Sequence, residues 1–77
     1  MKIDFNEFVA LLKEQYLDDV GEIYKENKFR ELPGWDSMTG MTILLMIEEN
    51  YKLKIDNDQF KKLNTINDLY IFINEKS

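Results

Sequence analysis

The fold is decided by the stretch PGWDSMTGMTILLMIEENY, residues 33–51. The Pro-Gly pair at 33–34 is a turn signal that stops any preceding element, and Asp36 is a suitable N-cap for a following helix. Apolar residues then recur at helical spacings on more than one side, which predicts a helix over 37–52 that is flanked by several elements. Gly40 costs this helix about 1 kcal/mol relative to Ala, which indicates a close approach or a bend there.

Outward from this stretch, the pattern predicts three further helices and one long connection. Capping residues and apolar spacings of three and four indicate helices over about 5–17 and 66–75, with a short helix over about 57–62. The pattern is interrupted over 18–35, where we expect a long irregular segment. The predicted fold class is all-α: a small four-helix bundle with three longer helices, a short third helix and a long loop between the first two helices.

The length and charge of the chain limit its class. Its 77 residues predict a single domain over 1–77. Its 10 basic and 15 acidic residues give a net charge of −5, which disfavours nucleic acid and acidic membrane surfaces and favours partners with a basic patch. No apolar run approaches about 18 residues, so we expect no membrane span, and the first residues lack the apolar region of a signal peptide. A cytoplasmic location fits these features.

The chain contains neither Cys nor His. Thiolate nucleophiles, the commonest general base and the commonest metal ligands are therefore missing. We expect no catalytic residue and no metal site, and we do not expect an enzyme. These properties describe a small acidic domain that acts through a partner.

Ser37 is the residue with a candidate chemical role. Its plain structural interpretation is part of a helix cap, since it directly follows Asp36 at a predicted helix start. Without a His to activate it, Ser37 is an unlikely nucleophile of its own. A Ser that another enzyme modifies needs only exposure and a site that favours phosphate, and a helix N-terminus favours phosphate. Both interpretations remain open from spacing alone.

The sequence around Ser37 resembles a known family. Residues 34–38, Gly-Trp-Asp-Ser-Met, are similar to the attachment motif of acyl carrier proteins, in which Asp-Ser-Leu carries 4′-phosphopantetheine. The downstream segments 43–51, 55–58 and 63–69 resemble, in order and spacing, the second helix, the next loop and the start of the fourth helix of that family. The resemblance covers residues 34–73 closely and the first helix in pattern only.

The resemblance implies a specific role. Ser37 would receive a 4′-phosphopantetheine arm from coenzyme A through a phosphopantetheinyl transferase, with Asp36 and Met38 beside the attachment point. The arm would hold an acyl or aminoacyl group as a thioester and present it to the enzymes that activate and transfer such groups. The implied protein is a monomeric cytoplasmic phosphoprotein of lipid or secondary-metabolite biosynthesis.

The second helix departs from the pattern of the family's fatty-acid members. Those members carry acids just after the Ser and one turn on, where this chain has Thr39 and Thr42. A less acidic helix should dock differently on basic enzymes, which favours a carrier for a dedicated pathway. Met41 is interpreted either as part of an apolar groove or as core. The residues predicted to recognise partners are Met38, Thr39, Met41, Thr42, Glu48 and Glu49.

One alternative function needs no prosthetic group. A small helical module would present the Met-rich second helix to a groove on a partner protein. In that case replacement of Ser37 is silent, whereas a charge at Met38 or Met41 abolishes binding.

Overall fold

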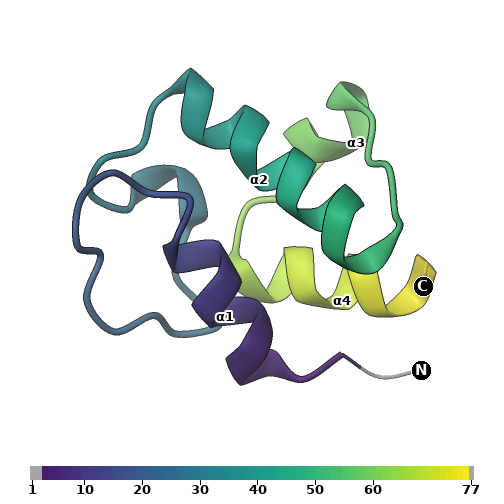
Figure 1. Ribbon diagram of the computed structural model, residues 1–77, viewed down its shortest axis with the longest axis horizontal. Helices are drawn as coiled ribbons and strands as arrows, with labels where there is room; N and C mark the ends of the chain where they lie inside the picture. Colours follow the sequence, from purple (N-terminus) through teal and green to yellow (C-terminus); the bar gives the residue numbers. More distant parts are fainter. Residues whose placement is uncertain (1–2, 77) are drawn as a thin grey trace.

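The structure is a computed structural model that describes residues 3–76. Within these residues the chain forms helices and loops and no strand, apart from one isolated bridge between Lys28 and Thr65. The prediction of an all-α fold is therefore confirmed (Figure 1). The elements are α1 (Phe5–Lys13), the short 3-10 helix η1 (Phe29–Glu31), α2 (Ser37–Tyr51), α3 (Asn57–Lys62) and α4 (Ile66–Lys76).

The first helix is shorter than predicted. We expected it over 5–17, but α1 ends at Lys13. Beyond it the amides of Gln15 and Tyr16 bond to carbonyls three residues back, at 3.0 and 3.2 Å, so the last turn tightens and stops. The buried Tyr16 hydroxyl donates to the carbonyl of Phe29 at 2.6 Å. This contact with the long connection holds Tyr16 in the core, outside the helix.

The other helix boundaries lie close to the prediction. The second helix, α2, ends at Tyr51, one residue earlier than expected, because Lys52 adopts a left-handed backbone conformation with φ 57°. The short helix α3 spans the predicted residues 57–62. The last helix, α4, continues to Lys76, one residue beyond the predicted end.

The core draws on all four helices and on the long connection. Two residues of α1, two of α2 and three of α4 are fully buried, and η1 adds Phe29 from the middle of the connection. The short helix α3 contributes Phe60, which is 8% exposed. This shared core makes the arrangement a small helical bundle. The fully buried side chains are Phe8, Leu12, Phe29, Ile43, Ile47, Ile66, Leu69 and Ile73.

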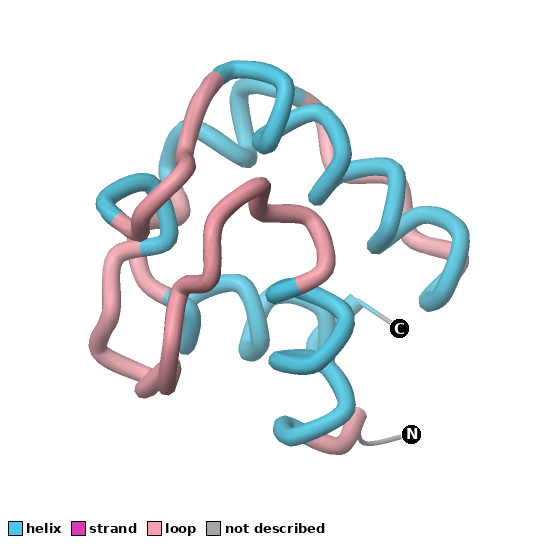
Figure 2. The backbone as a smooth tube through the Cα atoms, turned by 60° about the vertical axis from the view of Figure 1, so that its left-hand side comes forward, coloured by secondary structure: helices cyan, strands magenta, loops and turns pink. Residues whose placement is uncertain are grey.

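The long connection between α1 and α2 is ordered by contacts along its length. Figure 2 shows it as a loop interrupted by one helical turn, η1, before it reaches the start of α2. Near its end Gly34 has φ 82° and lies so close to Asp18 that an added Cβ would be 3.0 Å from the Asp18 backbone nitrogen. The two ends of the connection are thus packed against one another just before α2 begins.

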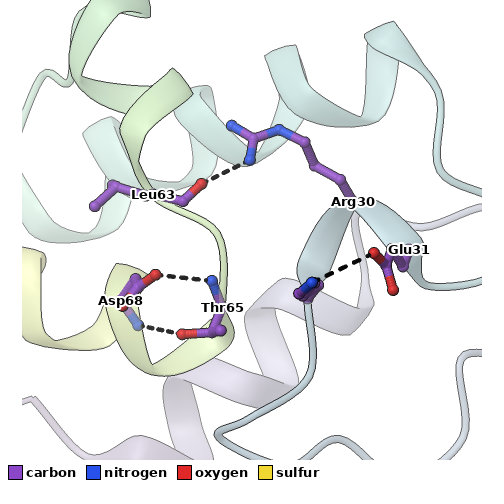
Figure 3. A network of polar contacts seen from close by, with 6 residues as sticks. Arg30, Glu31, Leu63, Thr65 and Asp68 are labelled. Carbon is purple, nitrogen blue, oxygen red and sulfur yellow. Dashed lines mark hydrogen bonds and ion pairs between the residues drawn. The ribbon is translucent and has the colours of Figure 1, made fainter.

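Arg30 of η1 ties the connection to the corner between α3 and α4. Its guanidinium donates to the carbonyl oxygens of Phe60 and Leu63, each at 2.6 Å. Figure 3 shows the bond to Leu63. The same group lies over the ring of Phe60, 5.0 Å from its centroid. At the start of α4, Figure 3 shows the reciprocal bonds of Thr65 and Asp68, which form a capping box. Both bonds are 3.0 Å long.

Candidate functional site

Ser37 is the first residue of α2, and it is exposed. The preceding residue, Asp36, is the N-cap and has an extended backbone. Its Oδ1 accepts from the Thr39 amide at 2.8 Å and from the Thr39 hydroxyl at 3.0 Å. The Thr39 hydroxyl in turn accepts from the Asp36 amide at 3.4 Å, which completes a capping box. The Asp36 carboxylate therefore caps the helix through Thr39.

The capping bonds also fix the charge of Asp36. The hydrogen bond from the Thr39 amide, supported by that from the Thr39 hydroxyl, holds the pKa of the Asp36 carboxyl below its ordinary value. Asp36 is therefore ionised at neutral pH. Its Oδ1 is engaged at the helix end, and the carboxylate keeps its negative charge beside Ser37.

The indole of Trp35 packs against the first turns of α2 at Gly40. A Cβ added at Gly40 would lie 3.1 Å from Cη2 of Trp35, so the close approach that Gly40 indicates is confirmed. The ring of Trp35 also packs edge-on against Phe29, at 5.9 Å between centroids, and against Tyr16 at 6.4 Å. The residues before Ser37 are thereby anchored to the core, and Ser37 itself remains outside it.

Four of the predicted recognition residues lie on the surface of α2. Met38 is 69% exposed and Met41 is 65% exposed. Glu48 and Glu49 are exposed near the end of the helix. These residues are accessible to a partner, and for Met41 the core interpretation is wrong.

The two threonines of the predicted set are placed differently. Thr39 is only 3% exposed, so its predicted position on the recognition surface is wrong: the side chain is used in the capping box. Thr42 is half-buried, and its hydroxyl donates to the Thr39 carbonyl at 2.9 Å. Thr42 thus bonds to its own helix and exposes only part of its surface.

A groove lies beside α2, as one of the two interpretations of Met41 predicted. It has a volume of about 500 Å³ and runs between α2 and the segment that leads into α3. Leu45, which is 56% exposed, lines it together with Met41, although Leu45 was not among the predicted residues. The sequence could have indicated that Leu45 lies beside Met38 and Met41, since residues i, i+3 and i+7 share one face of a helix.

The geometry fits a covalently attached prosthetic group. Ser37 is exposed at the N-terminus of a helix of 15 residues, and the first turn of this helix contains no acid. Such a helix end favours a phosphate group. The long connection does not cover the residue, so a tether on Ser37 has a route into solvent; Figure 1 shows the start of α2 at the periphery of the molecule.

Within residues 3–76, no helix combines the length and apolar character that crossing a membrane requires.

Comparison with known proteins gives a consistent result. The family model described as "Phosphopantetheine attachment site" matches residues 6–73. An acyl carrier protein of an Exiguobacterium species is 31% identical over 96% of this chain and 90% of its own length. An acyl carrier protein of Thermosynechococcus vestitus is 28% identical over 87% of this chain and 83% of its own length.

A third relative gives the same result. The acyl carrier protein of Helicobacter hepaticus is 26% identical over 90% of this chain and 91% of its own length. No solved structure matches the chain significantly. The family match covers the helix start at Ser37 and nearly all of the helical core. The chain therefore belongs to the acyl carrier protein family, whose prosthetic group is a covalently attached 4′-phosphopantetheine.

Proposed function

We propose that the attachment atom is Oγ of Ser37 and that the carrier moves acyl or aminoacyl groups as thioesters. The observation that carries this proposal is the exposed position of Ser37 as the first residue of α2. A tethered group needs a rigid anchor and an open route to solvent. The capping box between Asp36 and Thr39 supplies the rigid anchor, because it fixes the backbone on both sides of Ser37.

Loading requires a partner enzyme. A bond forms between Ser37 Oγ and the pantetheine-side phosphorus of coenzyme A, the phosphoanhydride bond of coenzyme A breaks, and the adenosine bisphosphate leaves. This chain has no His to accept the Ser37 proton, and we expect the transferase to supply the base. The N-terminal end of α2 stabilises the phosphate that stays on the protein.

The bound group supplies what the sequence lacks. When attached, 4′-phosphopantetheine provides a thiol, and this chain contains no Cys. We expect a chain that holds and presents its cargo without catalysing a reaction, as a cytoplasmic monomer and a single carrier domain. Its expected partners are a phosphopantetheinyl transferase and the enzymes of lipid or secondary-metabolite biosynthesis that activate and transfer acyl or aminoacyl groups.

The serine content of the chain makes a sharp test possible. Ser37 and Ser77 are the only serines in the sequence. The purified protein is incubated with coenzyme A and a phosphopantetheinyl transferase, and the intact mass is measured for the wild type, Ser37→Ala and Ser77→Ala. The wild type and Ser77→Ala should each gain one phosphopantetheine, and Ser37→Ala should gain none. A gain by Ser37→Ala contradicts the proposed attachment atom.

A further inference from the structure

Two aromatic rings occupy the space next to Gly40, on the buried side of α2 and three residues after Ser37. A Cβ added at Gly40 would lie 3.1 Å from Cη2 of Trp35 and 3.6 Å from Cε2 of Phe60. Phe60 belongs to α3 and is only 8% exposed. A single added carbon would therefore contact both rings. The rings already fill the place that an alkyl chain would need to enter the interior between α2 and α3.

These two rings belong to a larger aromatic cluster, which we define as Tyr16, Phe29, Trp35 and Phe60. Between ring centroids, Phe29 lies 5.4 Å from Phe60 and 5.9 Å from Trp35. Trp35 in turn lies 6.4 Å from Tyr16. Such distances are those of aromatic side chains in direct contact. An apolar chain would have to separate these rings before it could enter, and a close-packed interior resists that change.

Arg30 fastens α3 to the aromatic cluster. Its guanidinium lies over the rings of Phe29 and Phe60, 4.5 and 5.0 Å from their centroids. The same group donates to the carbonyl oxygens of Phe60 and Leu63 at the end of α3. A helix of six residues has little stability of its own, so α3 depends on these contacts for its position. The contacts of Arg30 therefore keep α3 and its ring against α2.

The surface groove beside α2 offers an apolar chain only partial cover. Its apolar lining includes Met41 and Leu45, which are themselves 65% and 56% exposed. Its lining also includes Glu48, Lys54 and Asp56, all of them exposed. An alkyl chain in this groove would stay in contact with water and would remove water from charged groups, and both effects are unfavourable. A short or polar cargo avoids both.

We propose that this domain carries a short or polar acyl or aminoacyl group and keeps it outside the helical core, because the aromatic cluster closes the interior to an alkyl chain. This inference rests on the proposed function of Ser37. A short or polar cargo loses little by remaining in water, whereas every CH₂ group of a long apolar cargo would be left hydrated. The cargo is then held by its thioester alone and is open to the active site of each partner enzyme.

The test compares two cargoes on the same chain. Ser37 is loaded by a broad-specificity phosphopantetheinyl transferase with acetyl-coenzyme A or with hexanoyl-coenzyme A, and the intact mass confirms one acyl arm per chain. In the wild type the two forms should unfold within about 1 °C of each other. An alkyl chain bound by the protein would instead raise the thermal midpoint by about 5 °C or more, because buried CH₂ groups stabilise the folded state.

Thioester cleavage gives a second measurement on the same samples. Hydroxylamine should cleave the acetyl and hexanoyl arms at the same rates as the corresponding thioesters of free coenzyme A, because neither arm is covered by the protein. A chain bound in the interior would draw its thioester toward the helices and slow the cleavage of the hexanoyl form alone.

A variant that opens the cluster should reverse the result. Phe60→Ala removes one ring and leaves a cavity that the end of an apolar chain can fill. In this variant the hexanoyl form should unfold about 3 °C or more above the acetyl form. Ile71→Ala truncates an apolar side chain that is 45% exposed on α4, and its two forms should unfold together, as in the wild type. The wild-type comparison decides the inference by itself if Phe60→Ala does not fold.

Each outcome has a separate meaning. A wild type that the hexanoyl group stabilises, or whose hexanoyl thioester is protected from hydroxylamine, overturns this inference and leaves the proposed function in place. A folded Phe60→Ala variant whose two forms unfold at the same temperature shows that the cluster is not what excludes the chain, and it also overturns the inference. Failure of the wild type to load even with acetyl-coenzyme A overturns the proposed function, and this inference with it.

Discussion

The indole of Trp35 lies against Gly40 so closely that Cη2 is 3.1 Å from the position of a Cβ at residue 40. This relationship joins the end of the long connection to the second turn of α2. Trp35 also packs on the buried Phe29, so the start of α2 is held in a fixed position relative to the core. Ser37 is thus presented at a fixed place although its own side chain is exposed.

A larger side chain at Gly40 should displace the indole. Gly40→Leu is expected to lower the free energy of unfolding by about 2 kcal/mol, because overpacking a closed contact costs about 1–3 kcal/mol. Trp35 is the only tryptophan, so its fluorescence emission reports the displacement directly. Ala10→Leu, at an exposed position of α1, is the matched control and should change neither stability nor emission. Unchanged emission in Gly40→Leu would contradict the packing described here.

Removal of the Arg30 donors should loosen the corner between α3 and α4. Arg30→Met keeps the apolar stem and loses the two hydrogen bonds to the carbonyls of Phe60 and Leu63. Hydrogen bonds to charged groups contribute about 1.5–3 kcal/mol, so we expect a loss of about 2 kcal/mol and a lower thermal midpoint. Lys28→Met removes only the exposed ion pair with Glu31, 3.9 Å long, and should have little effect. Equal midpoints for the two variants would contradict this assignment.

Stability should depend on pH through Asp68. The amides of Thr65 and Asn64 donate to this carboxylate and hold its pKa below the ordinary value. Its contribution to the free energy of unfolding is therefore present above the unfolded pKa of about 3.9 and is lost as pH falls through the lower folded pKa.

The amide variant isolates this effect. Asp68→Asn removes the titrating group, so the thermal midpoint of this variant should change less than that of the wild type as the pH is lowered from about 5 to about 2.5. Thermal unfolding followed by circular dichroism across that range provides the comparison. Parallel curves for the two proteins would show that Asp68 does not contribute to the acid sensitivity.

Local signals in the sequence were sufficient to predict where the helices start. The N-cap at Asp36 and the bounds of α3 follow from capping residues and spacings within a few positions of each other. Gly40 also indicated correctly that another group approaches the helix. These features depend on neighbours in the chain, so a single sequence is enough to predict them.

The differences arise where distant residues meet. The early end of α1 accompanies the hydrogen bond between Tyr16 and Phe29, which are 13 residues apart. Thr39 was expected on the surface, but the predicted periodicity did not distinguish the capping threonine from the exposed positions beside it. Leu45 was treated as part of a broad apolar helix, and its spacing from Met38 and Met41 did not by itself show whether that face is buried; in the packed bundle Leu45 is exposed.

The most direct test of the central claim is the modification state of the protein from its native host. The chain is purified without added transferase, its intact mass is measured, and its peptides are fragmented to locate any added group. The account predicts one phosphopantetheine per chain, with or without a bound acid, on the peptide that contains Ser37. A native protein that is never modified, or one that carries the group on Ser77 or a threonine, would contradict it.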